Sequence, residues 1–226
     1  MVTGRGPRVV LLGKQGAGKG TQAARVAEHY GVVHLATGDI FRAAARDETE
    51  LGIEARKYID RGELVPDSIV IGVVREHLMA DDHALVANGF VLDGFPRTQV
   101  QAIELDVALG ADALHVVANL DVPTEVVLRR IAGRRVCVQC GTTYHIDQPP
   151  KDPWFCDVCG GHVVQRDDDT EDAVMRRLEL YEIQTLPVIQ YYRRSGRLLN
   201  VDGDGGSDEV FKALVEAIET RWEHPE

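Results

Sequence analysis

The sequence predicts an α/β fold: a parallel five-stranded sheet with helices on both faces, in three layers. Short apolar runs at residues 8–12, 90–94 and 113–120 have the composition of buried strands. Helical patterns lie between them, and strands that alternate with helices are typical of a parallel sheet covered on both sides. The chain of 226 residues is long enough for one sizeable core with small inserted units.

The expected helices follow the strands in order along the chain. The first runs from Thr21 to Tyr30, directly after a glycine-rich stretch. A long helix is expected from Glu171 to Arg194, with Pro187 inside it, and a short strand at 197–201 follows. The remaining helical patterns run from Asp67 to Met79, from Thr98 to Leu109, from Thr124 to Ile131 and from 207 to 222.

Two segments interrupt this alternation. Residues 36–65 are polar, arginine-rich and helical in pattern, whereas residues 134–169 are rich in Cys, Gly, Pro and Asp. Both are predicted to be insertions into the sheet domain. The predicted core domain therefore consists of residues 1–35, 66–133 and 170–226.

Composition and charge restrict the function. Hydrophobic residues make up 44% and charged residues 27%, as in ordinary soluble globular proteins. The net charge of −11 disfavours general nucleic-acid binding, which depends on extended basic surface, so an anionic ligand must be held by local basic clusters. Apolar runs such as Ala113 to Leu120 are too short to span a bilayer, and no apolar signal segment precedes the first strand. We expect a cytoplasmic protein with no membrane or nucleic-acid partner.

Residues 13–21, GKQGAGKGT, predict a phosphate-binding loop (P-loop) between the first strand and the first helix. The spacing Gly13-x4-Gly18-Lys19 lets backbone N–H groups turn around a phosphate, and the helix N-terminus adds partial positive charge. Lys19 supplies a full charge at the β- and γ-phosphates. Thr21, displaced by Gly20 from the usual position after the lysine, places a hydroxyl near a nucleotide-bound Mg²⁺. The alternative is a chance glycine-rich turn, which would require neither the lysine nor this context.

Asp93 ends the apolar strand FVLDG, at the edge of the sheet where ligands of open α/β folds bind. Beside a phosphate loop, such a carboxylate is a candidate partner of Mg²⁺, directly or through water. On its own, an aspartate at the end of a strand is more often a turn residue or a helix cap.

Four cysteines lie in the second inserted segment. Cys137-x2-Cys140 and Cys156-x2-Cys159 are separated by 15 residues, which fits a tetrahedral Zn²⁺ site. Four thiolates leave no open position for water, so the zinc is expected to be structural. The alternatives are a redox dithiol, or His145 and His162 as substitute ligands.

A metal would supply stability that this small polar segment lacks, since units below about 40 residues rarely bury a sufficient core. Three aromatic residues of the segment, Tyr144, Trp154 and Phe155, are expected to form a small apolar cluster beside the metal.

Several motifs together resemble the adenylate kinases of the long-lid, zinc-binding type, a family of P-loop nucleoside monophosphate kinases. The resemblance covers the chain from Val9 to Val215. The motifs are GKGTQ at 18–22, TGDIFR at 37–42, GELVPD at 62–67, DGFPRT at 93–98, RRIAGRR at 129–135 and RDDDTEDAVMRRL at 166–178.

The resemblance implies reversible phosphoryl transfer from Mg²⁺-bound ATP to AMP, giving two ADP, by direct in-line transfer under a closing lid. Residues 36–65 would then bind AMP, and residues 134–169 would form the lid. A monomer is the family expectation. The implied catalytic residues are Lys19, Arg97, Arg134, Arg166 and Arg177.

The same resemblance assigns nucleotide contacts. Gln101 would read the adenine edge of AMP, and Asp168 with Asp169 would orient the lid arginines. The implied ATP-binding residues are Gly16, Ala17, Gly18, Lys19, Gly20, Thr21, Arg130, Arg134, Thr143, Tyr144 and Gly205. The implied AMP-binding residues are Thr37, Arg42, Glu63, Leu64, Val65, Gly94, Phe95, Pro96, Arg97, Gln101, Arg166 and Arg177.

One position departs from the family pattern, and two other functions compete. The family usually has Pro two residues after the first loop glycine, where this chain has Gln15. A UMP/CMP-type or GTP-dependent nucleoside monophosphate kinase would keep the same cradle and arginines. A zinc-ribbon nucleic-acid-binding module is the other alternative, although the acidic run Asp167-Asp168-Asp169 disfavours it.

Overall fold

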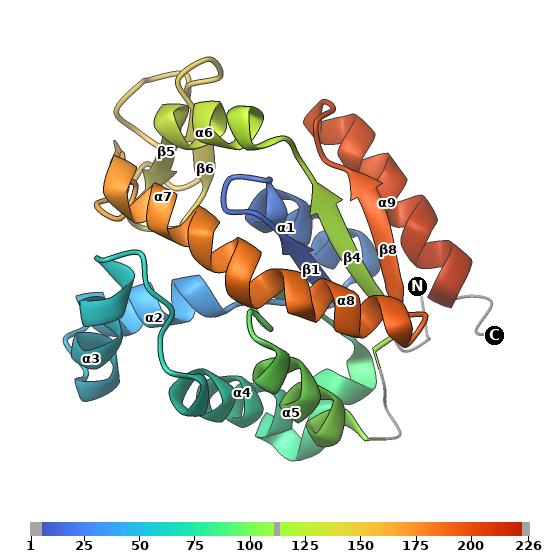
Figure 1. Cartoon of the computed structure of the whole chain (residues 1–226). Coiled ribbons are helices and arrows are strands. Elements are labelled where there is room, and N and C mark those ends of the chain that lie inside the picture. The colour runs from blue at the N-terminus through green and yellow to red at the C-terminus, as the bar shows by residue number, and fades with distance from the viewer. Residues whose placement is uncertain (1–5, 111–113, 223–226) are drawn as a thin grey trace.

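A five-stranded parallel sheet forms the centre of the molecule (Figure 1). The computed structural model describes residues 6–110 and 114–222, so Ala113, expected at the start of a strand, lies outside the described residues. Each strand pairs in parallel with its neighbours. The strands, in their order across the sheet, are β2 (Val33–Ala36), β3 (Phe90–Asp93), β1 (Arg8–Gly13), β4 (Val116–Asp121) and β8 (Leu198–Asp202).

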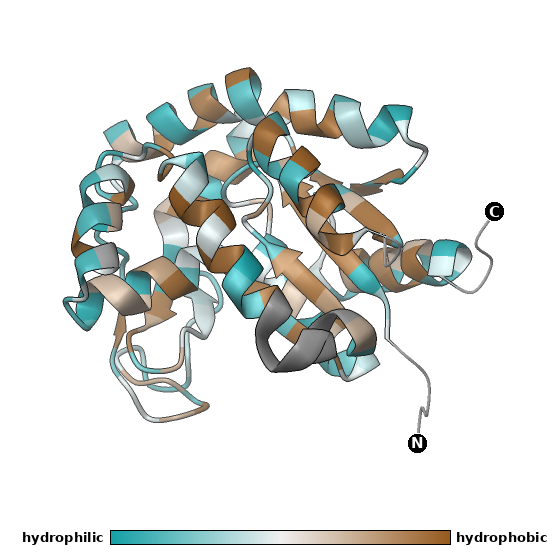
Figure 2. Ribbon diagram, turned by 90° about the horizontal axis from the view of Figure 1, so that it is seen from below, coloured by the Kyte–Doolittle hydropathy of each residue, from teal (hydrophilic) through white to brown (hydrophobic). Residues whose placement is uncertain are grey.

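Helices cover both faces of this sheet, as the sequence predicts. Side chains alternate across each strand, so Val9 and Leu11 of β1 face one apolar cluster while Val10 and Leu12 face the other. The first cluster lies under α1 (Lys19–Tyr30) and α9 (Ser207–Trp222). The second lies under α4 (Asp67–Asn88), α5 (Gln99–Leu109) and α8 (Leu186–Arg194). Figure 2 shows the hydrophobic residues gathered on the strands and on one side of the surrounding helices.

Local signals fix several helix ends. Thr98 precedes α5, and its hydroxyl accepts a hydrogen bond from the Gln101 amide at 3.2 Å. Thr170 caps α7 (Glu171–Leu180) in the same way through the Ala173 amide at 3.3 Å. Gly31 ends α1 in the left-handed conformation, which glycine adopts without strain.

The helix predicted from Glu171 to Arg194 is one continuous helical run, with a π-helical segment in its middle that the sequence did not predict. After α7 the chain forms a π-helical segment at Tyr181–Thr185 before α8 begins. Pro187, near the start of α8, has no backbone N–H for the preceding turn, and a wider turn accommodates that gap. Pro187 therefore lies within a continuous helical run, which widens just before it.

The edge strand β2 is an element that the apolar pattern did not reveal. It has four residues, and only Leu35 among them is buried. A strand this short and this exposed carries neither a continuous apolar run nor a clear alternation. It enters the sheet through its parallel pairing with β3.

The two inserted segments differ in structure. Residues 36–65 contain the helices α2 (Thr37–Arg46) and α3 (Glu50–Ile59). After α6 (Thr124–Gly133), the cysteine-rich segment forms a small antiparallel sheet, which the sequence did not predict. In Figure 1 this segment lies beside α6 and α7. Its strands, in the order β6-β5-β7, are β6 (Thr143–His145), β5 (Arg134–Cys137) and β7 (Val163–Val164).

Within residues 6–110 and 114–222, none of the helices combines the length and the apolar composition that a bilayer crossing requires.

Candidate active site

A cleft of about 1160 Å³ opens where β1 and β3 end. The phosphate loop forms one wall, and α2 with the residues after β3 forms another. Residues of the cysteine-rich segment, including Thr143 and Tyr144, also border the cleft. The cleft therefore lies at the carboxyl edge of a parallel sheet, which is where ligands of such folds bind.

The phosphate loop has the geometry that its glycines predict. Gly16 and Gly18 adopt φ values of 82° and 95°, which disfavour any side chain. Gly16 also packs closely on α6, since a Cβ atom there would lie 2.7 Å from Ile131. Lys19 folds back over the loop, and its Nζ donates to the carbonyls of Gly13 at 2.8 Å and Lys14 at 2.9 Å.

Lys19 is held in an environment that disfavours its charge. Desolvation lowers its pKa to about 8, and the nearby Arg97 and Arg134 act in the same direction, while Asp93 opposes them. Asp93 stands against the first turn of α1, where a Cβ atom on Gly20 would lie 3.3 Å from its Oδ2. An anion entering this site would relieve the unfavourable charge of Lys19.

Four arginines line the part of the cleft between α2 and α7: Arg42, Arg97, Arg166 and Arg177. Two carboxylates hold three of them, whereas Arg97 donates through Nε to the carbonyl of Gly94 at 2.8 Å. Asp168 accepts from Arg177 at 2.7 Å and lies 4.0 Å from Arg42. Asp39 accepts from Arg42 at 2.5 Å and lies 3.9 Å from Arg166. The sequence predictions did not single out Asp39, although it lies inside the TGDIFR motif.

The pKa values of this cluster reflect an excess of positive charge. Desolvation, and then the neighbouring Arg177, lower the pKa of Arg97 to about 10. Desolvation and Arg42 lower the pKa of Arg166 to about 10. Burial alone would raise the pKa of Asp168, but Arg177 and Arg42 hold it below its ordinary value. Such a cluster is suited to bind a polyanion such as a phosphate group.

Both polar atoms of the Gln101 side chain bind protein groups. Its Oε1 accepts from the Arg97 amide at 2.7 Å, and its Nε2 donates to Asp67 Oδ1 at 2.7 Å. Asp67 also accepts from the Thr98 hydroxyl at 2.9 Å. Contact between Gln101 and a base would use the second N–H or lone pair of its amide, or displace one of these bonds. Asp67 was not predicted as a site residue, although it ends the GELVPD motif.

Two arginines approach from the other side of the cleft. Arg130 donates to the carbonyl of Gly203 at 2.9 Å, beside Gly205 at the rim. Arg134 donates through Nε to Asp169 Oδ2 at 2.8 Å, and its Nη2 also contacts the same carboxylate. Asp169 is completely buried, so it holds Arg134 firmly at the base of the cysteine-rich segment.

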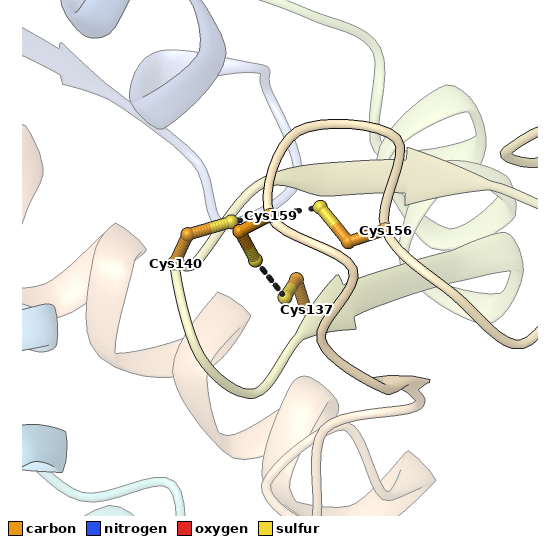
Figure 3. A group of neighbouring side chains, drawn as sticks. All are labelled: Cys137, Cys140, Cys156 and Cys159. Carbon is orange, nitrogen blue, oxygen red and sulfur yellow. Dashed lines mark hydrogen bonds between the residues drawn. The ribbon is translucent and has the colours of Figure 1, made fainter.

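The four cysteines converge on one point (Figure 3). Their Sγ atoms all lie within 4.8 Å of one another, as ligands of a single tetrahedral ion would. The Tyr144 hydroxyl lies 3.3 Å from Cys156 Sγ and accepts from the Asp157 amide at 2.9 Å. Burial raises the pKa of Cys156, but hydrogen bonds, led by that of Tyr144, outweigh it and lower the pKa to about 6. The donor set fits zinc.

The predicted aromatic cluster beside the cysteines is wrong for two of its three members. Trp154 is 71% exposed and Phe155 is 43% exposed. Phe155 packs instead against His162, with ring centroids 5.0 Å apart. Tyr144 alone packs on Cys137, Cys156 and Val163. A strand of two or three residues gives too little surface to cover a tryptophan.

The structure brings nearly all of the predicted nucleotide-contacting residues to this one cleft. Phe95 is the exception: it is 1% exposed within the hydrophobic core, so its side chain does not line the cleft. The predicted residues that line it are Gly16, Ala17, Gly18, Lys19, Gly20, Thr21, Thr37, Arg42, Glu63, Leu64, Val65, Asp93, Gly94, Pro96, Arg97, Gln101, Arg130, Arg134, Thr143, Tyr144, Arg166, Arg177 and Gly205.

Comparison with known proteins agrees with this site. The family model described as adenylate kinase matches residues 11–197. Adenylate kinase of Carboxydothermus hydrogenoformans is 46% identical over 215 residues, which cover 94% of this chain and 99% of the relative. Those of Methanothrix thermoacetophila and Clostridium botulinum are 48% and 50% identical, over 93% and 90% of this chain and 97% and 94% of the relatives. The chain belongs to the adenylate kinase family.

Proposed function

We propose that this chain catalyses the reversible transfer of the terminal phosphoryl group of ATP to AMP, giving two ADP. The observation that carries the proposal is the arrangement of cations around one cleft. Lys19 and the phosphate loop form its donor side, and the cluster of Arg42, Arg97, Arg166 and Arg177 faces them. Two phosphorylated substrates can thus meet head to head.

The chemistry needs positioning and charge stabilisation more than a protein nucleophile. The acceptor phosphate of AMP is already ionised, and the transferring group spreads negative charge over its oxygens. In the proposal, Arg42 and Arg97 hold the AMP phosphate. Lys19, Arg134, Arg166 and Arg177 stabilise the charge on the transferring group, and Arg130 contacts ATP.

Further contacts complete the proposed ATP site. The backbone of residues 16–20 cradles the phosphates, with the helix N-terminus of α1 behind them. Gly205, Thr143 and Tyr144 border the ATP end of the cleft. Tyr144 serves two purposes here, because its hydroxyl faces the cysteines.

The proposed AMP pocket lies between α2 and the residues after β3. Thr37, Glu63, Leu64, Val65, Gly94 and Pro96 line it. Phe95 supports it from the core, and Gln101 reads the adenine edge after exchanging its contact with Asp67.

Mg²⁺ is proposed to accompany the nucleotide, because adenylate kinases use it with ATP. Thr21 and Asp93 are the residues proposed to meet it, a role supported by their lining of the cleft and by the electrostatic interaction of Asp93 with Lys19. When bound, the ion would offset the negative charge of the phosphates.

Structural zinc is proposed for the four cysteines. Thiolates of Cys137, Cys140, Cys156 and Cys159 complete a closed shell, so the ion would stabilise the segment and leave catalysis to the arginines. Residues 134–169 would then move as a lid that excludes water from the cleft, and residues 36–65 would carry AMP. A cytoplasmic location and a monomeric state follow from the family expectation.

A coupled assay across four acceptors tests the proposal. With ATP as donor, ADP production should depend on AMP and should be far slower with CMP, UMP or GMP. Preference for CMP or UMP would replace the proposal by a pyrimidine-specific kinase, and dependence on GTP as donor would replace ATP. ADP formation that is independent of any acceptor would indicate an ATPase and contradict it.

A further inference from the structure

The side chain of Gln15 joins the phosphate loop to the base of the proposed lid. Its Nε2 donates to Asp169 Oδ1 at 3.2 Å, across 154 residues of chain. A carboxylate can only accept, so the amide nitrogen must be the atom that faces it. Asp169 is the last residue of the proposed lid.

Asp169 also binds the first residue of the lid. Arg134 donates to both of its carboxylate oxygens, and the side chain of Asp169 is 0% exposed. The two ends of the lid segment are therefore tied together by one buried ion pair. Gln15 adds the phosphate loop as a third member.

The hydrogen bond between Gln15 and Asp169 fixes the relative position of two segments but adds little net stability to the fold. Gln15 Oε1 is buried with no hydrogen-bond partner among the described residues, which costs free energy. The phosphate loop already packs, through Gly16, on Ile131 of α6, the helix that precedes the proposed lid. A less polar side chain of similar length would avoid the orphaned oxygen, so the amide is best explained by its bond to Asp169.

We propose that Gln15 is a positioning residue that fixes the Arg134–Asp169 pair against the phosphate loop and thereby places Arg134 over the donor phosphates. The inference rests on the proposed role of Arg134. When Arg134 turns toward a phosphate, Asp169 keeps its hydrogen bond from Gln15 and so keeps its position relative to the phosphate loop. A hydrogen bond to a charged group is strong enough for its loss to be measured in turnover.

The first test replaces Gln15 by methionine, which keeps the length and removes both polar atoms. In Gln15→Met, kcat/KM for ATP should fall about tenfold, the size expected for loss of one hydrogen bond to a charged group, with KM for AMP nearly unchanged. The melting temperature should change little, because the lost bond and the removed orphan oxygen offset each other. Gln190→Met, at an exposed position of α8, is the matched control.

A second comparison separates positioning from general support of the fold. In an Arg134→Ala background, Gln15→Met should cause almost no further loss, because its effect passes through Arg134. Unchanged kcat/KM for ATP in Gln15→Met, or an undiminished loss in the Arg134→Ala background, would overturn the inference. If the wild-type protein did not transfer phosphoryl groups from ATP to AMP, the proposed function would be overturned and, with it, the inference.

Gln15→Glu provides an independent readout through pH. Its carboxylate would face Asp169, and the repulsion should reduce kcat/KM for ATP more than methionine does. Lowering the pH toward about 5 should recover part of the loss relative to wild type, because protonation restores a donor at this position. Absence of such recovery, with the variant folded, would contradict a hydrogen-bond role for position 15.

Discussion

Asp168 and Arg177 form a nearly buried ion pair, with Arg177 Nη2 donating to Asp168 Oδ2 at 2.7 Å and side-chain exposures of 8% and 13%. A second donor of Arg177 reaches the Asp168 carbonyl at 3.0 Å, and a further bond reaches the carbonyl of Ile59 at the end of α3. One arginine thus connects α7, the end of the proposed lid and the proposed AMP-binding segment. Carboxylates thus fix the positions of arginines that we propose bind phosphate.

Removing the charge of Asp168 should therefore affect both stability and catalysis. In Asp168→Asn, the free energy of unfolding should fall by about 1–3 kcal/mol, since Arg177 keeps its position with a weaker acceptor. Turnover should also fall, because the asparagine would hold Arg177 and Arg42 less firmly than the carboxylate does. Chemical denaturation and the coupled assay measure the two effects.

Asp167→Asn is the matched control for this change, since Asp167 is an exposed neighbour in the same acidic run. It should leave both quantities near wild type. Equal effects of the two substitutions would show that stability and turnover depend on net charge and not on the Asp168–Arg177 ion pair.

Replacing Lys19 by methionine should abolish most turnover without harming the fold. The side chain lies in a site that lowers its pKa, so an uncharged residue of similar length removes an unfavourable desolvated charge. We expect kcat to fall by a factor of about 10²–10³, as for loss of one catalytic charge-stabilising group. The melting temperature should change little, because removal of the desolvated charge offsets loss of the two hydrogen bonds to the carbonyls of Gly13 and Lys14.

The decisive comparison for Lys19→Met is between turnover and melting temperature on the same preparation. Near-normal turnover would show that Lys19 has no catalytic role. A collapsed melting transition would mean that the lysine supports the loop and that its catalytic role has not been isolated.

Local motifs made much of the fold and of the candidate site predictable, whereas features that depend on long-range contacts could not be predicted from the sequence. The P-loop, the two CxxC pairs and the buried strands each depend on residues close in sequence. The edge strand β2 was missed because it has four residues, of which Val33 is exposed and His34 is polar and half-buried, so it gives no apolar pattern. The bond between Gln101 and Asp67, and that between Gln15 and Asp169, span 34 and 154 residues and left no sequence signal.

The lowered pKa of Lys19 predicts a pH dependence of ATP binding. In the free protein the pKa of Lys19 is about 8, below the ordinary lysine value of 10.5, so the lysine loses its proton as the pH rises through 8. Bound phosphate favours the charged form, so binding above this pH must take up a proton. KM for ATP should therefore rise with pH above 8, while below it the dependence should be flat.

Calorimetric titration of ATP in two buffers of different ionisation enthalpy measures this proton uptake directly. At about pH 8.5 the wild-type protein should take up a proton on binding, and Lys19→Met should not. Equal uptake by both proteins would assign the proton to another group.

Zinc removal should act on the cysteine-rich segment before it acts on the sheet. We expect about one zinc per chain in cleanly purified, reduced protein, since the four Sγ atoms form one site. Cys140→Ser, or a strong chelator, should release the ion, expose all remaining thiols to a thiol reagent, and lower kcat/KM for ATP more than for AMP. Zinc well below one per chain, or full activity after its removal, would contradict the assignment.

The most direct measurement of the central claim follows the terminal phosphoryl group itself. Wild-type protein is incubated with γ-labelled ATP, Mg²⁺ and AMP, and the products are separated. Direct transfer predicts that the label appears in ADP, only when AMP is present, with no labelled protein and almost no labelled inorganic phosphate. Label released as phosphate, or retained covalently on the protein, would contradict direct transfer between two nucleotides in this cleft.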